Sequence, residues 1–103
     1  MQGGYLYILS NKNRTVLYIG TTTDIRIRIL EHKTGARKGF TYKYNCYDLM
    51  YFTEYFDLDE AMAVEKRMKR WRREWKINLI LKNNPEMIDL AKDWYTAEDL
   101  NQV

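Results

Sequence analysis

One glutamate stands on the apolar face of an expected amphipathic helix. Between residues 58 and 68 the apolar side chains recur at helical steps, and the core-facing positions are Leu58, Ala61, Met62, Glu65 and Met68. An ionised carboxylate that faces an apolar core is costly unless a cation, a metal ion or several hydrogen bonds compensate it. Two explanations are open for Glu65: an ion pair with one of the many lysine and arginine side chains, or a functional site that uses the carboxylate.

Two tyrosines near the N-terminus are expected to share one surface of a β-hairpin. The segments Tyr5-Leu6-Tyr7 and Tyr18-Ile19-Gly20 flank a loop of turn-forming residues, Asn11-Lys12-Asn13-Arg14, which predicts two antiparallel strands. Side chains alternate along a strand, so Tyr7, Tyr18 and Gly20 fall on one face and the aliphatic residues on the other. Two phenols beside a small glycine would line a concave patch, and ordinary packing of tyrosines in a sheet is the alternative explanation.

The order of these residues resembles the GIY-YIG nuclease family, in particular its small single-domain UPF0213-like type and the N-terminal domain of excinuclease C. Two such tripeptides in the first two strands are the hallmark of the family, and ten residues, 8 to 17, separate them in this chain. Tyr5 stands where the first family motif has glycine, while its closing tyrosine is present as Tyr7. The resemblance covers residues 4 to about 90 and continues through Asp24-Ile25-Arg26-Ile27-Arg28, His32, Gly39-Phe40-Thr41-Tyr42-Lys43-Tyr44-Asn45, Glu65, Lys66, Lys69, Trp71, Arg72, Lys76 and Leu79-Ile80.

The resemblance implies hydrolysis of a DNA phosphodiester bond by water with the help of Mg²⁺ or Mn²⁺. Tyr7 would orient or deprotonate the attacking water, with Tyr18 as its hydrogen-bonding companion. Arg28 would stabilise the charged transition state, His32 would belong to the same site one helical turn later, and Glu65 would be the metal ligand. Because a phenol with a pKa of about 10 is a poor base at neutral pH, we expect Arg28 to place positive charge near Tyr7.

Basic residues gather in two segments, and aromatic side chains are interleaved with one of them. The net charge is +3, but residues 86–103 carry −4, which leaves +7 on residues 1–85. Polyanions are the expected partners of such a chain. Phosphates would bind the lysine and arginine side chains, and bases would stack on the aromatic rings. The alternative is that the basic residues form a solvated face without a partner. Six residues are expected to contact DNA: Lys38, Lys43, Lys69, Arg72, Lys76 and Asn78. Asn78 is included because its distance from Glu65 along the chain is similar to that of an asparagine in the family.

The strands and helices expected from the sequence predict an α+β fold, with a small three-stranded antiparallel β-sheet flanked by helices. The expected strands lie at about residues 4–10, 15–20 and 47–56. The expected helices lie at about residues 24–35, 58–68 and 72–82. Asp24 and Gly35 are the expected caps of the first helix, Asp57 and Glu60 have capping-box spacing before the second, and residues 36–46 are expected to form a loop.

The last part of the chain is expected to hold one more short helix. Asn84 would cap a helix that begins at Pro85, because proline fits the first helical position. Beyond it, the tail with Trp94, Tyr95 and Leu100 is expected either to pack a last turn on the core or to fray.

Length and composition indicate one folded domain over residues 1–103, with its motif core at 4–90 and an acidic tail at 91–103. The hydrophobic content is 46% and the aromatic content 15%, which suits a small globular core. The lone Cys46 excludes an internal disulfide, and one cysteine with one histidine is too few for a zinc site. No leader or membrane-length apolar run is visible, so we expect a cytoplasmic protein without a membrane partner.

These observations predict a metal-dependent DNA endonuclease. A non-catalytic nucleic-acid-binding module that retains the same fold is the alternative, and a third interpretation makes Glu65 part of a structural ion pair. Because the chain has no attached domain, we expect low intrinsic specificity or a protein partner that supplies it. The sequence leaves the DNA structure that is recognised and the oligomeric state open.

Overall fold

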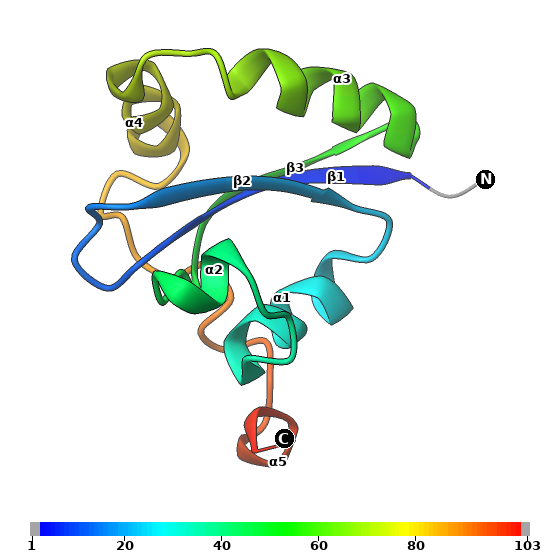
Figure 1. Cartoon of the computed structure of the whole chain (residues 1–103), viewed down its shortest axis with the longest axis vertical. Helices are drawn as coiled ribbons and strands as arrows, with labels where there is room; N and C mark the ends of the chain where they lie inside the picture. The colour runs from blue at the N-terminus through cyan, green and yellow to red at the C-terminus, as the bar shows by residue number, and fades with distance from the viewer. Residues whose placement is uncertain (1–2, 102–103) are drawn as a thin grey trace.

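A computed structural model describes residues 3–101, and over that range the chain has the predicted α+β fold. One antiparallel sheet in the order β2-β1-β3 carries helices on both faces (Figure 1). None of the helices in this range is long and apolar enough to cross a lipid bilayer. The strands are β1 (Gly4–Ser10), β2 (Leu17–Thr22) and β3 (Asp48–Tyr55). The helices are α1 (Ile25–Thr34), α2 (Phe40–Lys43), α3 (Leu58–Met68), α4 (Arg73–Asn83) and α5 (Ala97–Leu100).

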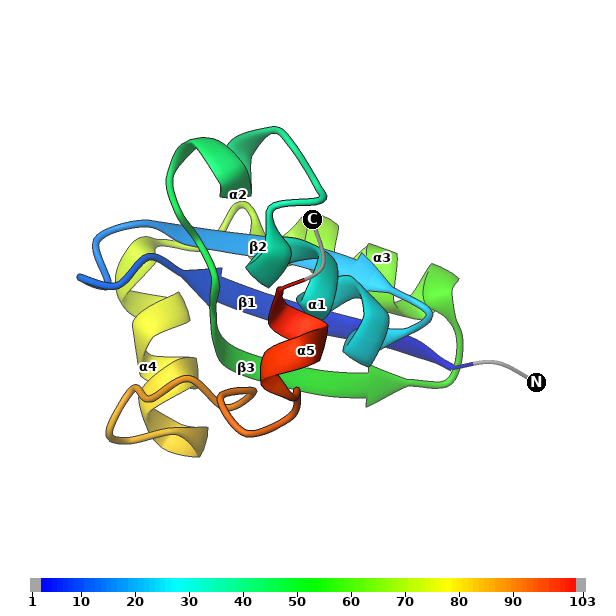
Figure 2. The same cartoon turned by 90° about the horizontal axis from the view of Figure 1, so that it is seen from below.

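The central strand β1 buries side chains on both of its faces. Leu6 and Ile8 pack in the cluster that contains residues of α3 and α4, whereas Tyr7 and Leu9 pack in the cluster that contains residues of α1. Figures 1 and 2 show α3 and α4 on one side of the sheet and α1, α2 and α5 on the other. The sheet therefore separates two layers, and only its edge strands β2 and β3 can bring side chains of both layers close together.

Side-chain caps confirm the predicted starts of two helices. Asp24 accepts a hydrogen bond from the backbone N–H of Ile27, and Asp57 accepts one from the backbone N–H of Glu60. Gly35 ends α1 with a φ of 75°, a left-handed conformation that glycine adopts without strain. As a result α1 starts directly after β2 and α3 starts directly after β3.

Residues 36–46, predicted as a loop, contain the one-turn helix α2. Gly39 precedes it with a φ of 120°, which a residue with a side chain rarely adopts. The N–H groups of Tyr44 and Cys46 donate to the carbonyl groups of Phe40 and Thr41, at 3.0 and 2.8 Å. A single turn has no apolar period, so hydrophobic periodicity could not reveal this helix.

The buried stripe of α3 is rotated from the predicted one. Met62 is 50% exposed, and Val64 packs against the core in its place. At about 3.6 residues per turn, Met62 lies on the flank of the line that joins the buried residues Ala61 and Met68. Glu65 lies close to that line and is partly buried, as predicted.

The prediction that Asn84 caps a short helix from Pro85 is wrong. The segment at Pro85 is a turn, and the Asn84 side chain is buried against the edge strand β3. Its amide nitrogen donates to the carbonyl groups of Met50 and Ile88 at 3.1 and 2.8 Å, and its oxygen accepts from the Ile88 N–H. A buried amide needs these partners, and β3 offers one that a local helix could not.

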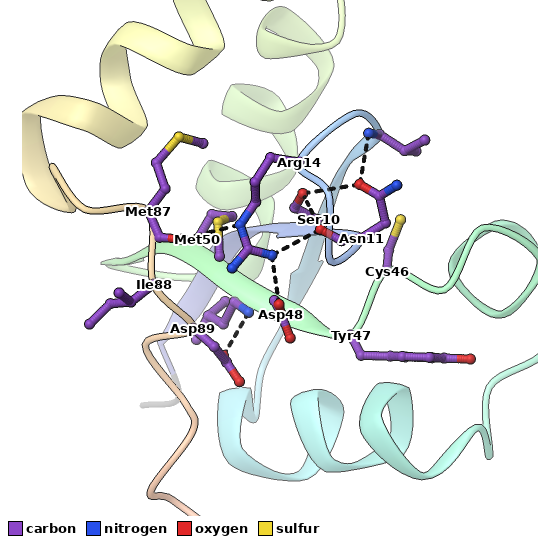
Figure 3. Close-up of polar contacts among 12 residues, drawn as sticks. Ser10, Asn11, Arg14, Cys46, Tyr47, Asp48, Met50, Met87, Ile88 and Asp89 are labelled. Carbon is purple, nitrogen blue, oxygen red and sulfur yellow. Dashed lines mark hydrogen bonds and ion pairs between the residues drawn. The ribbon is translucent and has the colours of Figure 1, made fainter.

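Arg14 connects the β1–β2 turn to the start of β3 and to the C-terminal segment. Its guanidinium donates to the carbonyl groups of Asn11 and Met87 and forms an ion pair of 2.6 Å with Asp48. Figure 3 shows Arg14 reaching between these three residues, with Asp89 bonded to the backbone of the neighbouring strand. Because these contacts join segments far apart in the chain, they hold the hairpin in one position on the sheet.

The tail packs on the core instead of fraying. Trp94 and Tyr95 lie against the apolar cluster under α1. Arg26 donates to the Trp94 carbonyl at 2.7 Å, and the Tyr95 hydroxyl donates to the Arg26 carbonyl at 2.6 Å. Leu100 belongs to α5, which supplies the expected last turn, but its side chain is largely exposed.

Candidate active site at the edge of the sheet

Three aromatic rings from three elements meet on the α1 side of the sheet. Tyr7 comes from β1, Tyr18 from the edge strand β2 and His32 from α1. Their ring centroids are 6.3 Å apart for the tyrosine pair, 5.6 Å for Tyr7 and His32, and 6.0 Å for Tyr18 and His32. The two tyrosines share a surface, as the alternation along the strands predicts.

Gly20 makes room for the Tyr7 hydroxyl. The two residues are partners in the register of β1 and β2. A Cβ atom at position 20 would lie only 2.5 Å from the phenol oxygen of Tyr7, which is too close for any side chain. The glycine of the second tripeptide is thus required by the close approach of this ring.

A buried chain of hydrogen bonds runs from Tyr7 through His32 to Thr41. The Tyr7 hydroxyl lies 3.0 Å from His32 Nε2, and His32 Nδ1 lies 3.0 Å from the Thr41 hydroxyl on α2. All three side chains are buried, and Tyr7 is only 1% exposed. A neutral imidazole has one donor and one acceptor nitrogen, so the two hydroxyl groups must take complementary roles and hold the ring in one orientation.

Burial keeps both Tyr7 and His32 uncharged at neutral pH. Burial raises the pKa of Tyr7 to about 12, although the Arg28 guanidinium beside the phenol opposes that rise. Burial, together with the positive charges of Arg37 and Arg28, lowers the pKa of His32 to about 4. Arg28 is near Tyr7 as expected, but its charge does not outweigh the loss of hydration of a buried phenolate.

Arg28 reaches the edge of the sheet from α1. Its Nη1 donates to the backbone carbonyl of Thr21 at 3.3 Å, and its Nε forms an ion pair with Glu31 at the same distance. Glu31 also contacts Arg37 at 3.7 Å. The guanidinium is held by these contacts and remains partly exposed, so it can still face a ligand.

Glu65 approaches the same strand from the opposite layer. Its carboxylate accepts a hydrogen bond of 2.9 Å from the Thr21 hydroxyl and forms an ion pair of 2.6 Å with Lys69. Thr21 therefore touches both halves of the candidate site, Arg28 through its carbonyl and Glu65 through its hydroxyl. This is possible because β2 is an edge strand with α1 on one side and α3 on the other (Figure 1).

The Glu65 carboxylate could hold a single divalent cation in place of the Lys69 ammonium, and it is satisfied without one. The Glu65 and Lys69 side chains are 19% and 54% exposed, so the ion pair between them contributes about 1 kcal/mol at most. Within residues 3–101, no three acidic, histidine or cysteine side chains are grouped closely enough to form a metal centre. One carboxylate fits Mg²⁺, which keeps several waters and completes its coordination with substrate phosphate.

A groove of about 280 Å³ lies along residues 17–19 of β2. It is lined by Leu17, Tyr18, Ile19, Phe40, Lys69 and Lys76. Tyr18 lines this groove, whereas Tyr7 is buried behind it. Of the two phenols, Tyr18 is therefore the one that a molecule in the groove can touch.

The residues predicted to contact DNA occupy three places. Lys69 and Lys76 lie in the groove along β2. Arg72 and Asn78 line a second, wider hollow on α4, of about 510 Å³, which contains none of the residues around Thr21. Lys38 and Lys43 lie over the rings of their neighbours Tyr42 and Tyr44, with the ammonium nitrogens 3.8 and 5.4 Å from the ring centroids.

Sequence reasoning missed three polar residues of the site. Glu31 was detectable, because it stands three residues after Arg28 on the same helix face. Thr21 and Thr41 carried no such signal, because their partners Glu65 and His32 come from other elements. Only the assembled fold brings those pairs together.

Comparison with known proteins agrees with this geometry. The model of the GIY-YIG catalytic domain matches residues 3–78. A UPF0213 protein of Oceanobacillus iheyensis is 32% identical over 76 residues, which are 74% of this chain and 87% of that protein. A UPF0213 protein of Pediococcus pentosaceus is 29% identical over 90 residues, 87% of this chain and 94% of the relative.

A solved structure has the same fold. The solution NMR structure of a UPF0213 protein from Bacillus halodurans matches with a TM-score of 0.53 and 29% sequence identity. The match covers 88% of this chain and 97% of that one. The matched domain, the relatives and the shared fold lead to one conclusion: the chain belongs to the GIY-YIG family, and within it resembles the UPF0213 proteins.

Proposed function

We propose that this protein is a divalent-metal-dependent endonuclease that hydrolyses DNA phosphodiester bonds beside Thr21 on β2. Membership of the GIY-YIG family supports a nuclease. The observation that carries the proposal is the position of Arg28 and Glu65, which contact one residue of the edge strand from opposite layers, next to a groove with two lysines. A phosphate in that position would lie between a guanidinium and a carboxylate able to hold a cation.

Each residue of the site has a proposed role. Glu65 would hold Mg²⁺ or Mn²⁺, which when bound neutralises charge on the phosphate and on the leaving oxygen. Arg28 would stabilise the negative charge of the transition state. Tyr18 would orient the attacking water, because its ring reaches the groove, and the buried pair of Tyr7 and His32 would hold that ring in place.

The protonation states limit what the aromatic residues contribute. With a pKa of about 12 for Tyr7 and about 4 for His32, neither group is close to the operating pH at which a general base works best. Tyr7 and His32 therefore contribute by holding the Tyr18 ring that would orient the water, and stabilisation of charge by Arg28 and the cation would supply the larger share of the rate.

DNA is the proposed partner, and the basic side chains are its proposed contacts. Lys69 and Lys76 would bind phosphates next to the cleaved bond, while Lys38, Lys43 and Arg72 would bind phosphates further along the strand. Asn78 lies beside Arg72, where an amide can bond to sugar or phosphate. We further propose that a protein partner supplies specificity.

We propose the cytoplasm as the location, since the chain has no pair of cysteines that an oxidising compartment could join.

One observation favours a second function, that of a DNA-binding module without catalysis. Glu65 already has two partners, the Lys69 ammonium and the Thr21 hydroxyl, so its carboxylate is satisfied in the absence of a metal ion. A module of this kind would bind DNA with a strong salt dependence and leave every strand intact.

Nicking of a supercoiled plasmid separates the two functions. The nuclease should convert the plasmid to the open circle with Mg²⁺ or Mn²⁺, and chelator should stop it. Binding measured in parallel over a range of salt concentrations shows whether the protein engages DNA. Salt-sensitive binding of a folded protein, without cleavage of the plasmid or of DNA with unpaired nucleotides in any metal, would favour the binding module.

A further inference from the structure

We propose that the groove along β2 binds an unpaired nucleotide of the DNA strand, with its base stacked on Phe40 and its phosphate on Lys69 and Lys76. The inference rests on the proposed nuclease function, and it adds the class of DNA that the site would select. An unpaired nucleotide beside the cleaved bond is present in flaps, bulges and single-stranded ends, and absent from an intact duplex.

Phe40 presents an aromatic surface to the groove. Phe40 is 47% exposed and belongs to the lining of the groove, so part of its ring is open to a ligand. The ring stacks on Tyr18 with a centroid distance of 5.8 Å and an interplanar angle of 27°, and Tyr44 lies 4.7 Å away. Tyr18 also lines the groove, so the two stacked rings form one aromatic surface on which a nucleobase could stack.

The two lysines give the groove the charge that a phosphate requires. No acidic residue lines it, although Glu65 lies next to Lys69. Within residues 3–101, Lys76 forms no ion pair, so its charge is uncompensated by the protein. A ligand with an aromatic ring at one end and a negative charge at the other matches this lining.

The size of the groove favours one nucleotide over a double helix. Its volume of about 280 Å³ is just below the range of small-molecule sites, about 300–1,000 Å³. In an intact duplex both faces of each base are covered by neighbouring base pairs, so Phe40 could not stack on one. An unpaired base has a free face, and unstacking it costs least where pairing is already absent.

The groove also adjoins the proposed site of cleavage. Tyr18 and Lys69 belong to its lining, and Lys69 is the ion-pair partner of Glu65. A nucleotide in the groove would therefore be next to the phosphate between Arg28 and Glu65. Cleavage should accordingly be directed to the margin between paired and unpaired DNA.

Binding of labelled oligonucleotides in the presence of chelator tests the inference without any cleavage. Three DNAs are compared: an intact duplex, the same duplex with one unpaired nucleotide in a bulge, and the bulge with an abasic sugar in place of that nucleotide. We expect the bulged duplex to bind about tenfold more tightly than the other two, since stacking on an aromatic ring is sequence-tolerant and strong. Equal affinities for all three would overturn the inference.

Variants assign the effect to Phe40. Phe40→Ala should lose about tenfold in affinity for the bulge and little for the intact or abasic DNA, and Phe40→Trp should keep the preference. Phe56→Ala is the matched control, because Phe56 is 66% exposed and lies outside the groove. Equal losses in Phe40→Ala and Phe56→Ala, or a preference that survives in Phe40→Ala, would contradict the assignment.

The outcome is separate from that of the nicking assay. If the protein nicks the plasmid but binds the three DNAs with equal affinity, this inference is overturned and the proposed nuclease function stands. A bulge preference that depends on Phe40, in a protein that cuts no DNA in any metal, would support the nucleotide site and exclude the nuclease.

Discussion

At the scale of single residues, burial decides the protonation of the two side chains at the centre of the site. Tyr7 and His32 share a hydrogen bond of 3.0 Å and have almost no contact with solvent. The pKa of the phenol moves up and that of the imidazole moves down, because each group avoids its charged form. Their pKa values diverge, and the pair is neutral over the whole physiological range.

The low pKa of His32 predicts a loss of stability in mild acid. His32 takes up a proton at about pH 6.5 in the unfolded chain and only at about pH 4 in the folded one, so between these values the unfolded state binds more protons. Its contribution to stability is complete above pH 6.5 and falls as the pH is lowered, by at most about 1.4 kcal/mol per pH unit.

Urea denaturation at several pH values measures this effect. Native protein should lose stability from pH 6.5 downwards, and His32→Gln should lose less over the same interval, because glutamine does not titrate. Arg28, Arg37 and the Tyr7 phenol surround the imidazole and stay in the same charge state throughout. Identical pH profiles for the two proteins would show that His32 is not held neutral.

Thr41 is predicted to be a positioning residue that acts through His32. Thr41→Val removes the hydroxyl that lies 3.0 Å from His32 Nδ1 and leaves that buried nitrogen without a partner. A bare nitrogen is easier to bury than an N–H group, so the imidazole should shift towards the form with the proton on Nε2. We expect a stability loss of about 1–3 kcal/mol, and Thr41→Ser should restore the native state.

Imidazole ¹⁵N chemical shifts report which nitrogen carries the proton. A changed tautomer in Thr41→Val that reverts in Thr41→Ser would confirm the positioning role. Native shifts together with native stability in Thr41→Val would mean that Thr41 only fills space.

At the scale of elements, the edge strand β2 brings the two halves of the site together. A central strand is covered by neighbours on both sides, whereas β2 has one free edge, around which α1 and α3 can both reach. Arg28 and Glu65 use that edge, and Thr21 is their common contact. The arrangement explains how residues from opposite faces of a sheet can act on one phosphate.

The partly exposed pair of Glu65 and Lys69 predicts that Glu65 contributes little to the stability of α3. Glu65→Gln keeps the hydrogen bond from Thr21 and removes an ion pair whose lysine is more than half exposed. We expect the free energy of unfolding to change by about 1 kcal/mol or less, measured by urea denaturation. A loss of several kcal/mol would instead support the interpretation of Glu65 as a structural, buried ion pair.

At the scale of the whole molecule, local sequence patterns predict the strands and helices, whereas contacts between distant parts of the chain could not be predicted. Strand alternation and the caps at Asp24 and Asp57 act within a few residues, so the sheet and the main helices could be predicted from sequence. The Asn84 side chain bonds to Met50, 34 residues away, and nothing near Asn84 in the sequence signals that partner.

The residues of the candidate site could likewise be predicted only in part. Residue types and spacing pointed to Tyr7, Tyr18 and Glu65, but which phenol reaches the groove depends on how α1 and α2 cover the sheet. The partner of Glu65 likewise depends on where α3 packs against β2. Exposure and pairing are properties of the assembled layers, so they could not be read from spacing.

Metal-dependent DNA cleavage at the edge of β2 should depend on Glu65, and the nicking rate of Glu65→Gln is the decisive measurement. Glu86→Gln is the matched control, because Glu86 is an exposed carboxylate that does not line the groove. With Mg²⁺ and a supercoiled plasmid, the native protein and Glu86→Gln should nick at the same rate, and Glu65→Gln should be at least about 100-fold slower. Equal rates for all three proteins would contradict the account.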